Sequence, residues 1–305
     1  MSVVEDALRI AQAHPRDLLA IVGPTGSGKT ALAASLAARI GGEVISADSV
    51  QIYRYFDVGS GKPTAEELSL APHHLVSTLD PMEHVDAAGW AVRAARAIAE
   101  VRARGGVPIV CGGTFLWVKA LLFGLAATPA GSATHRERYR LVAEREGRPA
   151  LHDRLRAVDA DSANRLHPND FVRVSRALEV YELTGRPLSS WQREHGFARP
   201  RHCTQSIAIA LEPETLTERI RARVRSWLAH GWVDEVEGLL LRGFGEARAM
   251  GSVGYTQVRA LIDGRATRDE LEPAIVRATR IFARRQRTWL NHADVTWLTQ
   301  SSSGT

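Results

Sequence analysis

Cysteine is rare in this sequence, and long hydrophobic runs are missing. The two cysteines, Cys111 and Cys203, are too few for a disulfide framework or a cysteine-based zinc site, which fits a reducing compartment. No apolar stretch approaches the ~20 residues that a membrane-spanning helix needs. Residues 1–17 contain acids and lack the apolar core of a signal peptide. We therefore expect a cytoplasmic protein with no membrane role.

Lysine is also scarce, and arginine supplies nearly all of the positive charge. Lysine occurs only at Lys29, Lys62 and Lys119, although the 305-residue chain has a formal net charge of +5. A basic surface attracts nucleic acid, although a short basic segment taken alone is more typical of a solvated helix face. The arginines concentrate in three helix-like segments, residues 136–148, 219–227 and 277–289.

A glycine-rich segment, GPTGSGKT, lies between an apolar run and an alanine-rich run. Its spacing, G-x-x-x-x-G-K-T, lets backbone N–H groups converge on phosphate oxygens, while Lys29 adds positive charge and the Thr30 hydroxyl can hold Mg²⁺. Strand, loop and helix occur in the order that this motif requires. The sequence therefore predicts Mg²⁺ as cofactor and a phosphate-binding loop made of Gly23, Pro24, Thr25, Gly26, Ser27, Gly28, Lys29 and Thr30.

Strand-like and helix-like segments alternate through the first third of the chain. This alternation predicts an α/β fold, with a P-loop NTPase-like parallel sheet flanked by helices and with ligands at the carboxyl ends of the strands. The strand candidates cover residues 17–23, 43–49, 73–80 and 107–113, and the helix-like segments between them include 30–40 and 87–103.

The middle of the chain has a different pattern. Residues 129–199 are charged and helix-like, with no convincing strand, so we expect an inserted all-helical subdomain there. Residues 1–128 and 200–305 then form the P-loop-like core. Within the last third we expect a strand at 204–213, helices at 215–241, 255–262 and 268–289, a strand at 295–298, and a disordered tail from Thr299.

The loop alone leaves the reaction open, because a kinase, an ATPase and a diphosphate-releasing transferase all bind phosphate. An ATPase needs an acid on a second strand near Mg²⁺ and a residue that positions water, and no segment has an unambiguous form of either. Asp48 is the best-placed acid, because it ends the strand candidate that follows the first P-loop helix. The alternative for Asp48 is a cap on the following turn.

Six segments in order resemble the tRNA dimethylallyltransferases, also called tRNA isopentenyltransferases or IPP transferases. They are GPTGSGKT, ISADSVQIYRYFDVGSGKP, CGGTFLWVKALLFGL, HPNDFVRVSRALEVYELTG, SVGYTQV and ARRQRTWL, spread between residues 18 and 298. The resemblance implies transfer of a dimethylallyl group from dimethylallyl diphosphate to N6 of adenosine 37, beside the anticodon of tRNA, with release of diphosphate. A P-loop small-molecule kinase that uses ATP and a non-catalytic RNA-binding ATPase are the competing hypotheses.

The resemblance also implies roles for the catalytic residues. Asp48 matches the family's catalytic aspartate and would accept a proton from the adenine amine as the new bond forms. Lys29, the loop amides and Mg²⁺ at Thr30 would stabilise the departing diphosphate. Arg223, in the run RIRAR, matches a position implicated in the reaction, where it would pair with the diphosphate or stack on the extruded base. The alternative for Arg223 is a surface salt bridge.

The same matching implies a set of tRNA contacts on a protein that we expect to be a monomer. Three positions depart from the family pattern: Trp117 replaces a tyrosine, Val172 replaces a glutamine, and Ser132 lies in a run without the usual acid before Arg136. The implied tRNA contacts are Asp48, Ser49, Val50, Gln51, Thr114, Arg136, Val172, Arg173, Val174, Ser175, Arg176, Ser252, Val253, Gly254, Tyr255 and Thr256.

Overall fold

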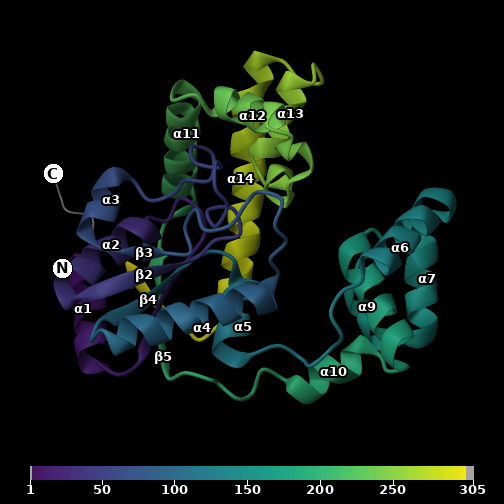
Figure 1. The fold of residues 1–305 in the computed structure, drawn as a ribbon, viewed down its shortest axis with the longest axis horizontal. Helices are drawn as coiled ribbons and strands as arrows, with labels where there is room; N and C mark the ends of the chain where they lie inside the picture. Colours follow the sequence, from purple (N-terminus) through teal and green to yellow (C-terminus); the bar gives the residue numbers. More distant parts are fainter. Residues whose placement is uncertain (1, 300–305) are drawn as a thin grey trace. The chain divides into compact units, whose positions relative to one another are not determined.

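The computed structural model describes residues 2–299 and divides the chain into two compact units. One unit contains residues 1–122 and 201–305, and the other contains residues 123–200 (Figure 1). Of the tail that the sequence predicts to be disordered, all but Thr299 lies outside the described residues. Each unit has its own hydrophobic core.

A parallel sheet forms the centre of the larger unit. Within the described residues it has six strands in the order β3-β2-β4-β1-β5-β6, and every neighbouring pair is parallel. The central strand β1 has the sequence LLAIV and is buried throughout, as expected for a strand covered on both faces. The predicted α/β class is therefore confirmed. The strands are β1 (Leu18–Val22), β2 (Gly42–Ala47), β3 (His73–His74), β4 (Val107–Gly112), β5 (Thr204–Ala210) and β6 (Thr296–Thr299).

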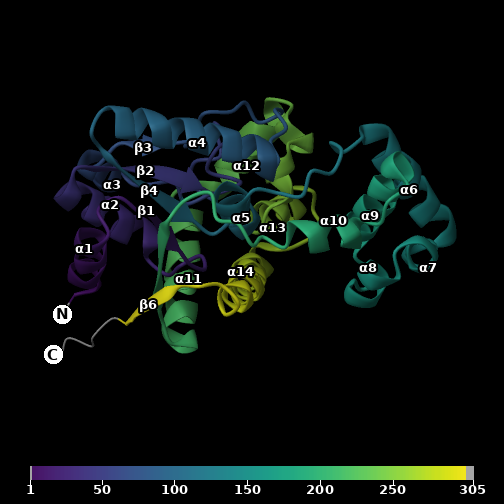
Figure 2. The ribbon, with the colours of Figure 1, turned by 90° about the horizontal axis from the view of Figure 1, so that it is seen from below.

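Helices cover both faces of this sheet. Helices α1 (Val3–Ala13) and α2 (Lys29–Ile40) bury apolar side chains against one face, where Leu19 and Ile21 of β1 also point. Helix α4 (Ala87–Ala103) covers the opposite face (Figure 2). Its Trp90 donates a hydrogen bond from Nε1 to the carbonyl of Ser46, at 3.1 Å.

The C-terminal helices complete the larger unit. Among residues 2–299, no helix is long and apolar enough to cross a membrane. Helix α14 is the longest of them, and Figure 1 shows it beside the other C-terminal helices. The remaining helices of this unit are α3 (Ala65–Leu70), α5 (Phe115–Phe123), α11 (Pro213–Ala229), α12 (Trp232–Leu241), η1 (Phe244–Glu246), η2 (Arg248–Gly251), α13 (Tyr255–Ile262) and α14 (Arg268–Leu290).

The smaller unit, residues 123–200, is all helical, and all of it lies within the described residues. Tyr139, Leu155 and Leu178 belong to its buried core, which is separate from the core of the sheet. Its helices after α5 are α6 (Ala133–Glu146), α7 (Arg148–Val158), α8 (Ala160–Arg165), α9 (Phe171–Thr184) and α10 (Leu188–His195).

Two predicted elements were wrong in extent. The strand expected at 73–80 ends at His74, because Leu75 and Ser77 take positive φ angles of 60° and 54° that turn the chain. The helix expected at 215–241 is two helices, because Gly231 between them has a φ of 86°. Glycine adopts this left-handed conformation easily, and it ends the first helix.

Helices α1, α3 and α5 were missed by the sequence analysis. For α1 the signal was present, since Val3, Ala7 and Ala11 recur at helical spacing and are buried. The side chain of Ser2 caps this helix by accepting a hydrogen bond from the Glu5 backbone at 3.3 Å.

Candidate active site

The predicted phosphate-binding loop joins the buried strand β1 to helix α2, which begins at Lys29. Gly26 and Gly28 have φ angles of 82° and 89°, which favour glycine. A Cβ atom at Gly26 would also lie 3.2 Å from the side chains of Leu216 and Ile220 on α11. The glycines therefore serve both the sharp turn and the close approach of α11.

Gln286 on α14 braces the start of this loop. Its Oε1 accepts a hydrogen bond from the Thr25 backbone at 2.9 Å, and its Nε2 donates to the carbonyl of Gly113 at 2.9 Å. The sequence analysis missed Gln286, although its burial between Ala283 and Leu290 follows helical spacing in an arginine-rich run. Because Gln286 occupies the Thr25 amide, the amides nearer α2 remain for a phosphate.

Within the described residues, Lys29, near the end of the loop, makes only one long hydrogen bond with its ammonium group. Its Nζ donates to the carbonyl of Pro24 at 3.4 Å. Burial lowers the pKa of Lys29, the charge of Asp48 acts to raise it, and that of Arg223 acts to lower it. Two cations that face the same space favour a ligand with more than one negative charge.

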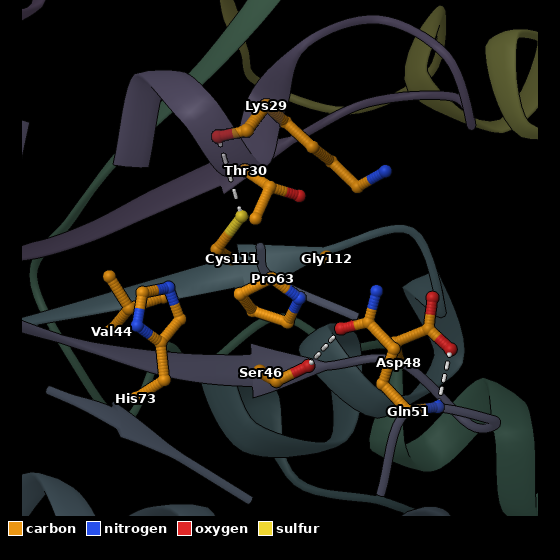
Figure 3. A pocket seen from close by; sticks show the side chains of 10 residues that line it. All are labelled: Lys29, Thr30, Val44, Ser46, Asp48, Gln51, Pro63, His73, Cys111 and Gly112. Atoms are coloured by element: carbon orange, nitrogen blue, oxygen red, sulfur yellow. Dashed lines mark hydrogen bonds between the residues drawn. The ribbon is translucent and has the colours of Figure 1, made fainter. Parts of the chain in front are cut away.

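Asp48 follows β2 at the carboxyl edge of the sheet. Its Oδ1 accepts hydrogen bonds from the backbone of Val50 at 2.9 Å and of Gln51 at 3.2 Å, so it does cap the next turn. Within residues 2–299 no group donates a hydrogen bond to its Oδ2. Figure 3 shows the Gln51 bond and the other oxygen pointing away from it. The capping role therefore leaves one carboxylate oxygen for chemistry.

A small cavity connects the loop with Asp48 (Figure 3). Burial raises the pKa of the Cys111 thiol to about 12, so this cysteine stays protonated and is not a nucleophile. Burial lowers the pKa of His73, whose Nδ1 hydrogen-bonds to the carbonyl of Ala71 at 2.9 Å, and this histidine is neutral. The lining residues are Lys29, Thr30, Val44, Ser46, Asp48, Gln51, Pro63, His73, Cys111 and Gly112.

A larger cavity, of about 360 Å³, also has Lys29 and Asp48 in its wall. This volume suits a small-molecule ligand or one nucleobase together with a small attached group. Ser49 and Thr114 meet at its wall, where the Ser49 backbone donates to Thr114 Oγ1 at 3.1 Å. Its lining residues are Thr25, Lys29, Asp48, Ser49, Val50, Gly59, Ser60, Thr114, Trp227, Trp232, Arg248, Ala249, Gly251, Ser252, Val253, Thr279, Phe282 and Gln286.

Arg223 on α11 lies near the same charges. Its Nη2 donates to the carbonyl of Gly61 at 3.5 Å, and its guanidinium stacks 4.3 Å from the ring centre of Trp227. Burial lowers its pKa, while the charges of Asp48 and Glu67 act to raise it. No carboxylate of the described residues forms an ion pair with Arg223, so the structure does not have the salt bridge considered as an alternative.

The remaining predicted contacts of the larger unit are less accessible. Gly254 lies under Trp232, and a Cβ atom on it would be 2.1 Å from that ring. Tyr255 is fully buried, whereas Thr256 is exposed at the start of α13. Trp117 is also buried, and it stacks on Trp90 with ring centres 5.3 Å apart rather than lining the described cavities.

The predicted contacts of the helical unit divide by exposure. Arg136, Val172 and Arg173 are exposed. Val174 and Ser175 are buried in that unit's core face, so they can hold α9 in place but offer no surface. Arg176 forms an ion pair with Glu179, donates to Pro129 and lies beside Thr128; Ser132 caps α6.

The donor chemistry at Thr30 fits Mg²⁺ only together with a ligand. Within residues 2–299 no three acidic, histidine or cysteine side chains come together as a metal site. Mg²⁺ is usually held by one or two protein oxygens together with substrate phosphates and water. The Thr30 hydroxyl, which lines the small cavity at the helix start, can supply such an oxygen.

Comparisons with known proteins agree on one family. The sequence model described as IPP transferase matches residues 51–293, and that described as isopentenyl transferase matches residues 16–76. The tRNA dimethylallyltransferase of Sorangium cellulosum is 58% identical over 289 residues, which cover 95% of this chain and 92% of that protein.

Solved structures show the same relationship. A tRNA isopentenylpyrophosphate transferase from Staphylococcus epidermidis is 35% identical, with a TM-score of 0.66 and coverage of 92% of each chain. A eukaryotic dimethylallyltransferase, solved while acting on tRNA, is 25% identical with a TM-score of 0.75, covering 93% of this chain and 74% of that one. The chain therefore belongs to the IPP transferase family, the tRNA dimethylallyltransferases.

Proposed function

We propose that this chain transfers a dimethylallyl group from dimethylallyl diphosphate to N6 of adenosine 37 in tRNA and releases diphosphate. The observation that carries the proposal is that both cavities are lined by Lys29 of the P-loop and by Asp48, one of whose carboxylate oxygens accepts no hydrogen bond from the described residues. The names of the relatives support a prenyl transfer to tRNA over the ATP-dependent kinase and the RNA-binding ATPase.

The loop end of the cavity is proposed to bind the diphosphate. Backbone amides at the start of α2 and the ammonium of Lys29 stabilise the negative charge that grows on the leaving group. Mg²⁺, when it is bound by Thr30 and the substrate, neutralises part of the same charge. Arg223 adds a second cation, which its stacking on Trp227 holds in orientation.

Asp48 is proposed to act as the general base. The lone pair of N6 attacks the allylic carbon, the bond from that carbon to oxygen breaks, and diphosphate leaves with the electron pair. The proton of N6 passes to Oδ2 of Asp48, while Oδ1 stays bonded to the turn. The adenine of adenosine 37 must leave the base stack of the anticodon loop to reach this position. A stacked adenine cannot meet both the Asp48 carboxylate and the allylic carbon.

The exposed and half-buried residues among the predicted contacts are proposed to bind the rest of the tRNA. In the larger unit these are the exposed Thr256 and the half-buried Ser252 and Val253, which line the larger cavity. In the helical unit they are Arg136 and Arg173, which are exposed. The buried residues among the predicted contacts, such as Val174 and Tyr255, then support these surfaces instead of touching RNA.

An assay with paired substrates tests the proposal. The chain is incubated with Mg²⁺, labelled dimethylallyl diphosphate and a tRNA transcript that has adenosine at position 37, and the matched control transcript has guanosine there. Label should enter only the first transcript, and diphosphate should be released only when both substrates are present. Phosphate transfer from ATP without RNA, in place of prenyl transfer, would restore the kinase hypothesis.

A further inference from the structure

One carboxylate outside the predicted site gathers an unusual number of hydrogen bonds. Glu235, in the first turn of α12, accepts from the backbone amides of Asp57 at 2.7 Å, Val58 at 2.5 Å and Gly59 at 3.3 Å. It also accepts from the hydroxyl of Tyr255 at 2.7 Å. Successive backbone amides that converge on one anion hold a loop in a single conformation.

Only an ionised carboxylate can satisfy these four donors together. It has about four acceptor positions and no hydrogen of its own, whereas a glutamine amide would place N–H groups against backbone N–H groups. Burial and the charge of Glu235 raise the pKa of Tyr255, so the phenol stays protonated and continues to donate.

The loop that Glu235 holds leads directly to the catalytic side chains. The carbonyl of Gly61 accepts from Gln51 Nε2 at 2.7 Å and from Arg223 Nη2 at 3.5 Å. The backbone of Gln51 in turn donates to Oδ1 of Asp48. A shift of this loop would therefore reach both Arg223 and Asp48.

The same carboxylate also reaches the opposite wall of the larger cavity. Gly59 and Ser60 line one side, and Ser252 and Val253, just before Tyr255, line another. Trp232, one turn earlier on α12, leaves no room for a Cβ atom at Gly59, which would lie 1.8 Å from its Nε1. The loop and the segment before α13 thus share one anchor.

We infer that Glu235 is a positioning residue, which fixes the spacing between the two cavity walls and through the loop aligns Asp48 and Arg223. Its effect on transfer rests on the function proposed above, whereas its effect on the loop does not. A displacement of about 1 Å in a catalytic group can cost about 10²-fold in rate. Loss of the anchor should therefore slow chemistry more than it weakens diphosphate binding.

The test compares Glu235→Gln with Glu237→Gln, an exposed glutamate on the same helix without a hydrogen bond among the described residues. Hydrogen exchange should accelerate at residues 57–59 in Glu235→Gln only. Single-turnover transfer should slow by about 10-fold to 100-fold, with diphosphate affinity unchanged. Tyr255→Phe keeps the carboxylate and its backbone hydrogen bonds, so it should slow transfer less than Glu235→Gln. It serves as a second test if Glu235→Gln does not fold.

Two results would overturn the inference. One is unchanged exchange at residues 57–59 in a folded Glu235→Gln protein. The other is a transfer rate equal to that of Glu237→Gln, with only the melting temperature lowered, since that pattern marks a purely structural role. If the wild-type chain itself fails to modify tRNA, the proposed function fails, while the exchange comparison still decides whether Glu235 holds the loop.

Discussion

The helical unit and helix α14 of the larger unit use arginine in opposite ways. In the helical unit most arginines form ion pairs with acids of the same unit, among them Arg138 with Glu182 and Arg154 with Glu146. On α14, Arg277, Arg280, Arg284, Arg285 and Arg287 are exposed, and none of them forms an ion pair with a described residue. The density of arginine in a sequence therefore does not measure the charge that remains free to attract a polyanion.

The unpaired arginines of α14 also have an order. Arg277, Arg280, Arg284 and Arg287 follow a spacing of three, four and three residues, which places them along one side of the helix. At about 1.5 Å per residue they extend over roughly 15 Å, enough to meet more than one backbone phosphate. The charged side chains that we propose to be catalytic, Lys29, Arg223 and Asp48, are also incompletely paired. Incomplete pairing is thus shared by α14 and the proposed catalytic residues, whereas Arg173, another proposed tRNA contact, is paired with Asp170.

The largest effect is expected where an unpaired charge does chemistry. Asp48→Asn keeps the shape and the turn-capping oxygen but removes the proton acceptor, so single-turnover transfer should slow by about 10²-fold or more. Binding of tRNA and diphosphate should stay near wild type. Transfer at a normal rate, or a combined loss of stability and tRNA binding, would leave Asp48 with the capping role alone.

A smaller but clear effect is expected for the α14 stripe. The triple variant Arg277→Gln, Arg280→Gln, Arg284→Gln removes three unpaired charges from an exposed face. Its tRNA affinity should fall by about tenfold or more, and the slope of log affinity against log salt should flatten by about 1 for each phosphate that the variant no longer binds. Filter binding across a salt series measures both. Unchanged affinity and slope would mean that this face does not meet RNA.

The buried lysine predicts a pH effect that is smaller again. Burial holds the pKa of Lys29 below its ordinary value of 10.5, and only the charged form attracts diphosphate. Affinity for inorganic diphosphate should therefore decline as pH rises, and it should do so before an ordinary lysine would lose its charge.

Lys29→Arg gives the matched control, because arginine keeps its charge over the same range. Titration calorimetry from about pH 7 to about pH 10 should show a decline in the wild type and a nearly flat profile in the variant. Cys111 does not confuse this range, because burial raises its pKa to about 12. Parallel profiles for both proteins would assign the pH dependence to another group.

The fold class and the loop could be predicted from local sequence patterns. Contacts between segments far apart in the sequence could not. The loop and the buried strand β1 have short-range signals in glycine spacing and apolar runs. Gln286 and Glu235 act on residues more than a hundred positions away, so no local pattern assigns them. The strand predicted at residues 73–80 was wrong in extent, because the chain turns at Leu75 and Ser77.

Which arginines are paired did not follow from the sequence for a related reason. The three arginine-rich segments look alike in the sequence, and pairing depends on which acids the fold brings near. Arg225 meets Glu272 on another helix, whereas Arg140 meets acids three and four positions away on its own helix. The i, i+3 and i, i+4 spacings of Arg140 were available in the sequence, and the long-range pair was not.

The smallest effect is expected for the paired arginines of the helical unit. Arg140→Gln and Arg154→Gln each remove a charge that nearby glutamates already neutralise. Exposed pairs of this kind contribute little to stability because solvent screens them, so each variant should unfold near the wild-type temperature. Affinity for tRNA should change by less than about twofold, because an arginine held by a glutamate is not available to bind a phosphate. The measurement is the same salt series used for the α14 variant. A loss as large as that of the α14 stripe would show that these pairs open on RNA, since an arginine that exchanges its glutamate for a phosphate contributes fully to the salt slope. The contrast between the helical unit and α14 would then apply only to the free protein.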